Sequence, residues 1–406
     1  MADVTCAGCG CACDDIEATV AEGRLAGITR TCALGDAWLA ERGGDRPPVA
    51  RVEGRAVDVD EAADAAAAIL GQARAPLVYG LGQTSCEAQR RAVALAEAAG
   101  AVLDPVGGGG TGLAHQAIGS STATFGEIRD RAGLVVAWRA DPALTNPRLL
   151  GRLRLDRAAR GSRTLVVVDA HRTATAEEAD VFVELDAARD FEALWALRAL
   201  VGRAPLDRER AGELPLGALD ELADRLAGAR HVALLYGAEA AHDELGALAL
   251  FALVRDLSRD RHAVALGLRD GGNARGAEDV LAWQTGFPGA VSFARGYPRA
   301  NPGELSAAGL LERGEVDAAL VIASDPLGHL PSAAADRLRG LPMAVIDART
   351  TATAAAARVA FATAADGIEI PGTAHRMDGV PVPLRAPLAG KRPGIEDVLS
   401  AIAGRL

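Results

Sequence analysis

Five of the six cysteines lie within the first 32 residues, and four of them have the spacing of a metal centre. Cys6, Cys9 and Cys13 form a C-x2-C-x3-C run, and Cys32 follows after a further eighteen intervening residues. Four soft thiolates are the donor set of a [4Fe–4S] cluster or of a structural zinc ion. From the residues alone, three outcomes stay open: an iron–sulfur cluster, zinc, or reduced thiols that hold nothing.

The other two cysteines have ordinary interpretations. Cys11 is too close in sequence to Cys9 and Cys13 to serve easily as a further ligand. Cys86 lies in a sequence with helical character, where a cysteine is most often a small buried hydrophobic residue. We therefore expect neither to bind metal.

A glycine-rich loop, Gly107–Gly112, follows the apolar strand expected at 101–103 and the Asp104-Pro105 pair. Such a strand exit can cradle phosphate, but this one matches neither a Walker loop nor a GxGxxG turn that opens a helix. A loop with almost no side chains offers no nucleophile, metal ligand or acid. The histidines are scattered, and no Ser-His-Asp or G-x-S-x-G arrangement is present, so the sequence gives little support for hydrolysis by this chain.

The sequence contains an internal repeat, which indicates the structural units that position these residues. Residues 166–181 and 344–359 match at a constant offset of 178 residues. Each copy is preceded by an apolar run that ends in Asp-Pro. Before each of these runs lies another apolar run, which ends in glycine. Three landmarks in the same order predict two related α/β units. We expect these at 56–205 and 206–366, between a leader at 1–55 and a tail at 367–406, with interleaving of the two units left open.

Each landmark indicates a buried parallel strand, and the segments between them have the length and apolar spacing of helices. The clearest helices are expected at 60–72, 85–99, 191–201, 244–257 and 394–405. This alternation predicts doubly wound parallel sheets, which bind ligands at the carboxyl ends of their strands. Residues at those ends are Gly80, Asp141, Asp169, Asp325 and Asp347. The alternative is that they only cap the helices that follow.

Length and charge exclude other classes. The 406 residues are enough for two or three domains, and 50% hydrophobic residues can fill more than one core. A net charge of −11 argues against binding to nucleic acid. The cysteine-rich start contains no apolar stretch, which predicts neither a signal peptide nor a membrane-spanning helix. We therefore expect a cytoplasmic protein.

Several segments together resemble the B subunit of formylmethanofuran dehydrogenase, a member of the molybdopterin oxidoreductases. They are CAGCGCACDDIEATV (6–20) with Cys32, YGLGQTSCEAQRRAVALAEAAGAVLD (79–104), DPALTNPR (141–148), VVVDAHRTATAEEADV (166–181) and PGTAHRMDGVPVPLR (371–385). The resemblance covers nearly the whole chain. It implies two doubly wound, Rossmann-like α/β units of the molybdopterin oxidoreductase type, with an N-terminal cysteine-rich module of the Fe–S type.

The resemblance also implies site residues. Cys6, Cys9, Cys13 and Cys32 match the ligands of a [4Fe–4S] cluster. Contacts to a bis-pterin guanine dinucleotide that carries tungsten or molybdenum are implied at Gly80, Asp141, Asp169, Thr173, Gly272 and Asn273.

One departure from the family pattern affects the functional prediction. Family members with formate chemistry place a metal-ligating cysteine in the loop after the strand aligned with 101–104, where this chain has Gly107–Gly112. Glycine has no donor to replace a thiolate. We therefore expect no tungsten or molybdenum, and loss of the molybdopterin guanine dinucleotide. No catalytic residue is assigned to this chain.

In this departure the chain is similar to the B subunit of the bacterial formyltransferase/hydrolase complex. That similarity implies a largely non-catalytic structural subunit in tetrahydromethanopterin-linked oxidation of formaldehyde to formate. The implied partners are an amidohydrolase-type A subunit with catalytic zinc and the C and D subunits. Two alternatives stay open: an active molybdenum or tungsten formylmethanofuran dehydrogenase subunit, and a stand-alone pterin- or nucleotide-binding protein.

Overall fold

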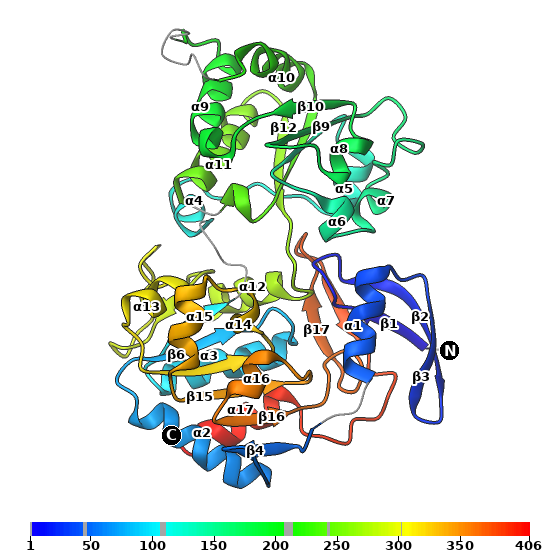
Figure 1. The fold of residues 1–406 in the computed structure, drawn as a ribbon. Coiled ribbons are helices and arrows are strands. Elements are labelled where there is room, and N and C mark those ends of the chain that lie inside the picture. Colours follow the sequence, from blue (N-terminus) through cyan, green and yellow to red (C-terminus); the bar gives the residue numbers. More distant parts are fainter. Residues whose placement is uncertain (1, 44–46, 106–110, 207–213, 242–243, 302) are drawn as a thin grey trace. The chain divides into compact units, whose positions relative to one another are not determined.

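The computed structural model describes residues 2–43, 47–105, 111–206, 214–241, 244–301 and 303–406 (Figure 1). The chain divides into two compact units. Unit 1 combines Met1–Gly108 with Gly271–Leu406, and unit 2 is Gly109–Asp270. Both units contain strands that alternate with helices, which confirms the predicted α/β class.

Unit 2 is built on a parallel sheet with the strand order β10-β9-β8-β11-β12. Both faces of the central strands are buried, as is usual for parallel sheets covered by helices. The strands are β8 (Leu134–Trp138), β9 (Thr164–Asp169), β10 (Val181–Glu184), β11 (His231–Tyr236) and β12 (His262–Gly267). The helices are α4 (Thr111–Ala117), α5 (Phe125–Arg131), α6 (Pro142–Thr145), α7 (Leu149–Arg152), α8 (Ala174–Glu178), η1 (Ala187–Arg189), α9 (Asp190–Val201), α10 (Leu216–Gly228), η2 (Glu239–Ala241) and α11 (Glu244–Leu257).

Unit 1 contains a mixed sheet with the order β13-β7-β6-β14-β15-β16-β4-β5. The run from β7 to β16 is parallel, whereas β13, β4 and β5 pair antiparallel at its edges. The strands are β4 (Ala50–Val52), β5 (Arg55–Val57), β6 (Pro76–Gly80), β7 (Val102–Pro105), β13 (Val291–Ser292), β14 (Ala318–Ile322), β15 (Met343–Asp347) and β16 (Val359–Ala362). The helices of this unit, apart from α1, are α2 (Val59–Gln72), α3 (Cys86–Ala98), α12 (Ala274–Thr285), α13 (Ala307–Arg313), α14 (Pro326–His329), α15 (Ser332–Arg339), α16 (Ala352–Ala356) and α17 (Ile395–Ala403).

Alternate residues of the unit 1 strands enter two different cores. Val78 of β6 packs in a core formed with α2, α3, α12 and α17. Its neighbours Leu77 and Tyr79 point into a core formed with α13 and α15. The period of two along each strand therefore lets one apolar run serve both faces of the sheet.

Two small antiparallel sheets complete unit 1 and hold the cysteine run. The first consists of β1 (Ala2–Cys6), β2 (Cys13–Ala21) and β3 (Arg24–Thr29), and α1 (Ala33–Gly43) follows it. The second pairs β17 (Gly372–His375) with β18 (Pro381–Leu384). The Thr5 hydroxyl donates to the Pro383 carbonyl oxygen at 2.7 Å, which ties the two sheets together.

Short polar side chains set the starts of several helices, as their sequences predict. Asp58 caps α2, Ser85 caps α3 and Thr173 caps α8, each accepting a hydrogen bond from a backbone N–H of the first turn. Thr124 forms a capping box with Glu127 at the start of α5. Among the described residues, no helix is both long and apolar enough to cross a bilayer.

The three repeated landmarks are present, but the expected division into units at 56–205 and 206–366 is not the one the structure shows. Each expected unit supplies a strand pair to one sheet and a strand triplet to the other. The pair β6–β7 joins the triplet β14–β15–β16, and the pair β11–β12 joins the triplet β8–β9–β10. The two sheets thereby share one spatial order, triplet then pair. The sequence repeat is real, but its two halves are exchanged between the sheets.

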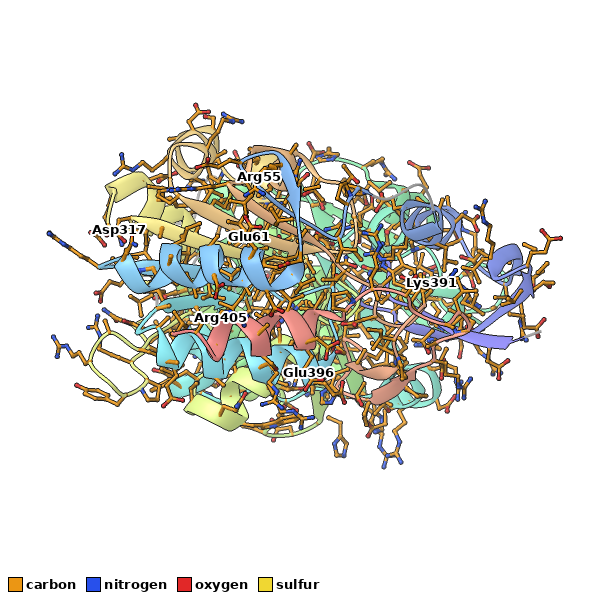
Figure 2. The ribbon with its side chains drawn as sticks, turned by 90° about the horizontal axis from the view of Figure 1, so that it is seen from below. Arg55, Glu61, Asp317, Lys391, Glu396 and Arg405 are labelled. Atoms are coloured by element: carbon orange, nitrogen blue, oxygen red, sulfur yellow. The ribbon has the colours of Figure 1, made fainter. Side chains whose placement is uncertain are left out.

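The expected leader and tail boundaries also need correction. Within the leader at 1–55, β4 pairs with β16 of the unit 1 sheet. Within the tail at 367–406, α17 buries an apolar face against α2 and α3. Figure 2 shows α17 beside α2, where the Arg405 guanidinium bonds Asp60 and Asp64 at 2.7 and 2.6 Å. The ends of the chain are therefore parts of unit 1, because both bury apolar surface against its sheet.

Candidate metal centre

The cysteine run forms the turn between β1 and β2. Cys6, the last residue of β1, lies opposite Cys13, the first residue of β2, in the antiparallel pair. Between them, the N–H of Ala12 donates to the Cys9 carbonyl oxygen at 3.1 Å, and Ala12 has a φ of 36°. Cys32 immediately precedes α1. The hairpin and the start of the helix thus position all four predicted ligands.

The four thiols are close together and largely shielded from water. Cys6, Cys9 and Cys13 are buried and Cys32 is half-buried, and none of them forms a disulfide. Burial raises the pKa of the Cys6 thiol to about 12, against a lowering by the Gly8 N–H, and the neighbouring thiols of Cys13, Cys9 and Cys32 raise it further. A thiolate in this position needs a cationic partner, which a soft metal group supplies. The donor set and its burial therefore fit such a group.

The described side chains do not converge on one point in the way that a single bound metal ion requires. Among the described residues, no three histidine, cysteine, aspartate or glutamate side chains are placed to hold one ion. Zinc requires its ligands at about 2.0–2.3 Å from one point, whereas the thiolates of a [4Fe–4S] cluster bind different iron atoms.

Cys11 has a role that its spacing did not indicate. The residue is completely buried inside the turn. Hydrogen bonds to the thiols of Cys13 and Cys9, together with burial, raise the pKa of the Cys11 thiol well above its ordinary value. Cys11 is thus a neutral donor to two of the four predicted ligands, and hydrogen bonds to ligand sulfur tune a metal site.

Two glycines allow other segments to pack closely against the turn. An ideal Cβ on Gly272 would lie 2.2 Å from the carbonyl oxygen of Ala7. A Cβ on Gly35 would lie 3.1 Å from Cys6 Sγ and 2.2 Å from Thr31 Oγ1. Gly272 was predicted as a dinucleotide contact, and in this structure it gives the backbone its close approach to the cysteine turn.

Asn273, the next predicted contact, connects three segments that are distant in sequence. Its Nδ2 donates to the Thr84 carbonyl oxygen at 2.6 Å, and its Oδ1 accepts from the His375 N–H at 2.7 Å. Its buried side chain also contacts Cys86 Sγ, at 3.6 Å from Nδ2. The buried interpretation of Cys86 agrees with this position. The side chain of Asn273 therefore links the segments at 84–86 and 373–375.

Three further predicted contacts, Asp141, Asp169 and Thr173, lie in unit 2 and make internal hydrogen bonds. Asp141 Oδ1 accepts from Thr175 N at 2.8 Å and from Thr175 Oγ1 at 2.6 Å. Thr173 caps α8. Asp169 is buried, accepts from its neighbour's N–H at 2.7 Å and lies 3.6 Å from Arg139 Nη1. Of these three residues only Thr173 caps the helix that follows it, since Asp141 makes no side-chain cap to α6 and bonds the first turn of α8 instead. Dinucleotide binding at these residues stays a prediction.

The same contacts recur at the equivalent strand ends of unit 1. Asp325 Oδ1 accepts from both the N–H and the hydroxyl of Thr353, as Asp141 does from Thr175. Thr351 caps α16, as Thr173 caps α8. The Asp347 carboxylate is held by Arg349 at 3.0 Å.

Gly80, the remaining predicted contact, lies at the end of β6 with a φ of 119°. An ideal Cβ there would lie 2.1 Å from the Ile322 carbonyl oxygen. Its counterpart in unit 2, Gly237, would place a Cβ 1.9 Å from the Arg139 carbonyl oxygen. Each glycine therefore permits the backbones of two neighbouring parallel strands to approach closely where the strands end.

Comparison with known proteins identifies the family. No protein-family model matches the chain. The B subunit of the tungsten-containing formylmethanofuran dehydrogenase 2 of Methanocaldococcus jannaschii is 34% identical, over 94% of this chain and 92% of that protein. The chain belongs to the family of formylmethanofuran dehydrogenase B subunits. The corresponding protein of Methanococcus maripaludis is 31% identical over similar shares, 94% and 93%.

The B-subunit family also includes a protein of the formyltransferase/hydrolase complex. The B subunit of that complex from Methylorubrum extorquens is 33% identical over 68% of this chain and 74% of its own length. A chain in the crystal structure of the same complex with methylofuran matches with a TM-score of 0.72 and 30% identity. The match covers 88% of this chain and 98% of that chain. The α/β fold is therefore shared with a solved multi-subunit complex.

The structure adds a residue that sequence reasoning missed. Arg42, at the end of α1, is buried and donates to the Trp38 carbonyl oxygen and to Gln83 Oε1 at 2.9 and 3.2 Å. Burial and the nearby Arg349 lower the pKa of Arg42 to about 10, and Cys6 is close enough to act in the opposite direction. Its only sequence signal is a tryptophan four residues earlier in the helix after Cys32. Gly107–Gly110 lie outside the described residues.

Asp366 carries a prediction about pH. The Ser85 N–H donates to its carboxylate at 2.7 Å, and burial raises its pKa to about 6. A folded-state pKa above the unfolded value of about 3.9 means that the folded protein loses stability as pH rises between these values. From pH 5.5 to 7.5 this loss amounts to about 1 kcal/mol. We expect Asp366→Asn to remove this loss of stability between pH 5.5 and 7.5. The free energy of unfolding in urea, followed by circular dichroism, measures it.

The control for this prediction is Asp260→Asn, because Asp260 is an exposed residue that forms no ion pair within the described part of the chain. It should leave the pH dependence as in the natural protein. Equal pH dependence in the Asp366→Asn variant and the natural protein would show that the buried carboxylate does not titrate in this range.

Proposed function

We propose that this member of the B-subunit family is a largely non-catalytic structural subunit of a cytoplasmic formyltransferase/hydrolase-type complex in one-carbon metabolism. The observation that carries the proposal is the sequence Gly107–Gly112 at the place where the family resemblance implies a metal-ligating cysteine. Glycine cannot hold tungsten or molybdenum. The chain would therefore keep the Rossmann-like units of the oxidoreductases without their redox chemistry.

The strand ends support this proposal. Asp141 and Thr173, two of the side chains predicted to contact a dinucleotide, are engaged in bonds at the start of α8. Their counterparts in unit 1, Asp325 and Thr351, make the same bonds. In both units the aspartate is bonded to the first turn of a neighbouring helix, α8 or α16, and the threonine caps that helix. The bound dinucleotide is thus not needed to account for these residues.

The cysteine turn fits a [4Fe–4S] cluster held by Cys6, Cys9, Cys13 and Cys32. When bound, such a cluster supplies one-electron transfer. In a subunit without tungsten or molybdenum, the four cysteines would instead use it to join β1, β2 and α1. The Gly8 N–H, which hydrogen-bonds Cys6, and the Cys11 thiol would stabilise the thiolates.

The proposed partners are an amidohydrolase-type A subunit with catalytic zinc and the C and D subunits. The solved relative supports an assembly, because it is a chain of a formyltransferase/hydrolase complex. The second candidate function is an active tungsten or molybdenum dehydrogenase subunit. It is favoured by the match to a tungsten-containing relative over 94% of this chain and by the retained cysteine turn.

Elemental analysis of the assembled complex tests the proposed function. The chain would be co-expressed with its A, C and D subunits in a host that makes the tungsten and molybdenum cofactors. We expect less than about one tenth of an equivalent of tungsten or molybdenum per chain, because no protein thiolate is available to hold it. Formyl hydrolysis should follow the zinc content of the A subunit.

A tungsten-containing B subunit from a methanogen, expressed in the same host, is the control for cofactor supply. Near-stoichiometric tungsten or molybdenum in this chain would establish the dehydrogenase alternative. Full formyl hydrolysis by A, C and D subunits without this chain would remove the structural role.

A further inference from the structure

A basic pocket lies at the edge of the unit 2 sheet opposite to the predicted dinucleotide contacts. It has a volume of about 400 Å³ and is bordered by the amino ends of three adjacent parallel strands, β9, β8 and β11. Arg131, Arg225, Arg230 and His231 contribute its charged and titratable groups. Ligands of parallel sheets usually bind at the carboxyl ends of the strands, so the expected cofactor does not explain this pocket.

The three arginines have no partner within the described part of the chain. Their guanidinium groups form no hydrogen bond and no ion pair there. The whole protein carries a net charge of −11, so unpaired arginines gathered around one hollow are not a result of general basicity. Guanidinium groups that converge on a concave surface without carboxylates are the usual arrangement for binding oxyanions.

The ordinary role of arginine at the end of a helix does not account for two of them. Arg131 and Arg225 lie in the last turns of α5 and α10, where cations stabilise the free carbonyl groups. Other arginines already perform this function. Arg163 donates to the Ile128 and Ala132 carbonyl oxygens at 3.0 and 2.7 Å, and Arg261 donates to the Leu226 carbonyl oxygen at 2.8 Å.

The neighbouring acidic side chains are also engaged elsewhere. Glu127 accepts bonds from the Thr124 N–H and hydroxyl in the capping box of α5. Asp130 is held by both Nε and Nη2 of Arg129 at 2.8 Å. Neither carboxylate forms an ion pair with any of the three pocket arginines.

His231 lies at the same pocket and stacks on His262 with ring centroids 5.0 Å apart and an angle of 8° between the planes. Partial burial, His262, and the positive charges of Arg230 and Arg131 lower its pKa. The excess positive potential of the pocket therefore acts on His231.

We propose that this pocket binds a small multivalent oxyanion of the phosphate class, held by Arg131, Arg225 and Arg230. The pocket volume suits a small molecule rather than a protein segment or a nucleic acid. Planar guanidinium groups pair with phosphate oxygens through two parallel hydrogen bonds. The site is independent of the cysteine turn and of the proposed structural role.

Titration calorimetry of the full chain with inorganic pyrophosphate tests the proposal, with inorganic phosphate and citrate as further ligands. We expect saturable binding of pyrophosphate that weakens at least tenfold in the double variant Arg225→Gln/Arg230→Gln. Arg24→Gln/Arg295→Gln is the matched control, because it removes two exposed arginines of unit 1 and changes the net charge equally. The control should bind as the natural protein does.

Pyrophosphate binding stronger than citrate binding would assign the pocket to phosphate-bearing ligands. No saturable binding of pyrophosphate, or tighter binding of citrate, would overturn that assignment. Equal weakening in both double variants would reduce the interaction to general charge attraction and would also overturn it. Melting curves of the free proteins check that the pocket variant is folded.

Discussion

Replacement of Cys9 by serine is expected to abolish the iron–sulfur chromophore of this chain. Protein purified anaerobically should be brown and contain about four iron atoms per chain, the content of one cluster. The Cys9→Ser variant should be colourless, with iron reduced at least tenfold. Serine oxygen is a poor substitute for a thiolate, and three remaining cysteines hold a cluster loosely. Iron analysis and the visible absorption spectrum measure the loss.

The position of Cys9 makes the substitution specific. Cys9 lies between Cys6 and Cys13 in the turn, and its carbonyl oxygen accepts the Ala12 N–H. The backbone bond survives the change to serine, so the loss of iron would come from the missing thiolate. The Cys11 thiol also loses one of its two sulfur partners.

Cys86→Ala is the matched control, because Cys86 is also a buried cysteine of unit 1 but lies outside the turn. It should retain the colour and the iron. A colourless natural protein whose thiols all react with maleimide would contradict the cluster. One equivalent of zinc that is lost in Cys9→Ser would replace it by a structural zinc site.

The positions of the elements could be predicted from the sequence, but the partner of each strand could not. The strand expected to end at Gly80 agrees with β6, and the helix expected at 60–72 agrees with α2 within a residue. Both depend on local information: an apolar run, a cap and a breaker. The sequence does not indicate whether β6 pairs with the triplet β8–β9–β10 or with β14–β15–β16. The observed pairing with β14 joins residues that are more than 200 positions apart. Because both triplets are equally apolar, the sequence offered no signal for the exchange.

The candidate site was predictable to the extent that its signal was local. The cysteine spacing indicated Cys6, Cys9 and Cys13, and the hairpin brings them together. Arg42 could not be identified in this way, since arginine is abundant in the chain and its burial depends on Gln83 from a distant segment. The role of Cys11 required the geometry of the turn, because hydrogen bonds between thiols have no sequence pattern.

Gly80 and Gly237 show what the two units share physically. In unit 1, β6 ends beside β14, and Gly80 is the last residue of β6. In unit 2, β11 ends beside β8, and Gly237 directly follows β11. Leu81 N donates to the Ile322 carbonyl oxygen at 3.1 Å, and Gly237 N donates to the Trp138 carbonyl oxygen at 3.3 Å. The close approach of the two strand ends is thus fixed by backbone hydrogen bonds in both units. A side chain added there must displace a central strand.

Gly80→Ala is therefore expected to be severely destabilising, by about 3–5 kcal/mol or to the point where no folded protein accumulates. The Cβ would lie 2.1 Å from the Ile322 carbonyl oxygen, and a φ of 119° is unfavourable for any L-residue. Gly237→Ala should have a comparable effect in unit 2. Gly54→Ala separates the two causes, because Gly54 has a φ of 80° but no atom within 4 Å of its ideal Cβ, so it should cost about 1 kcal/mol. Urea unfolding measured by circular dichroism compares the three. A Gly80→Ala variant no less stable than Gly54→Ala would show that β6 and β14 do not approach as closely as the structure indicates.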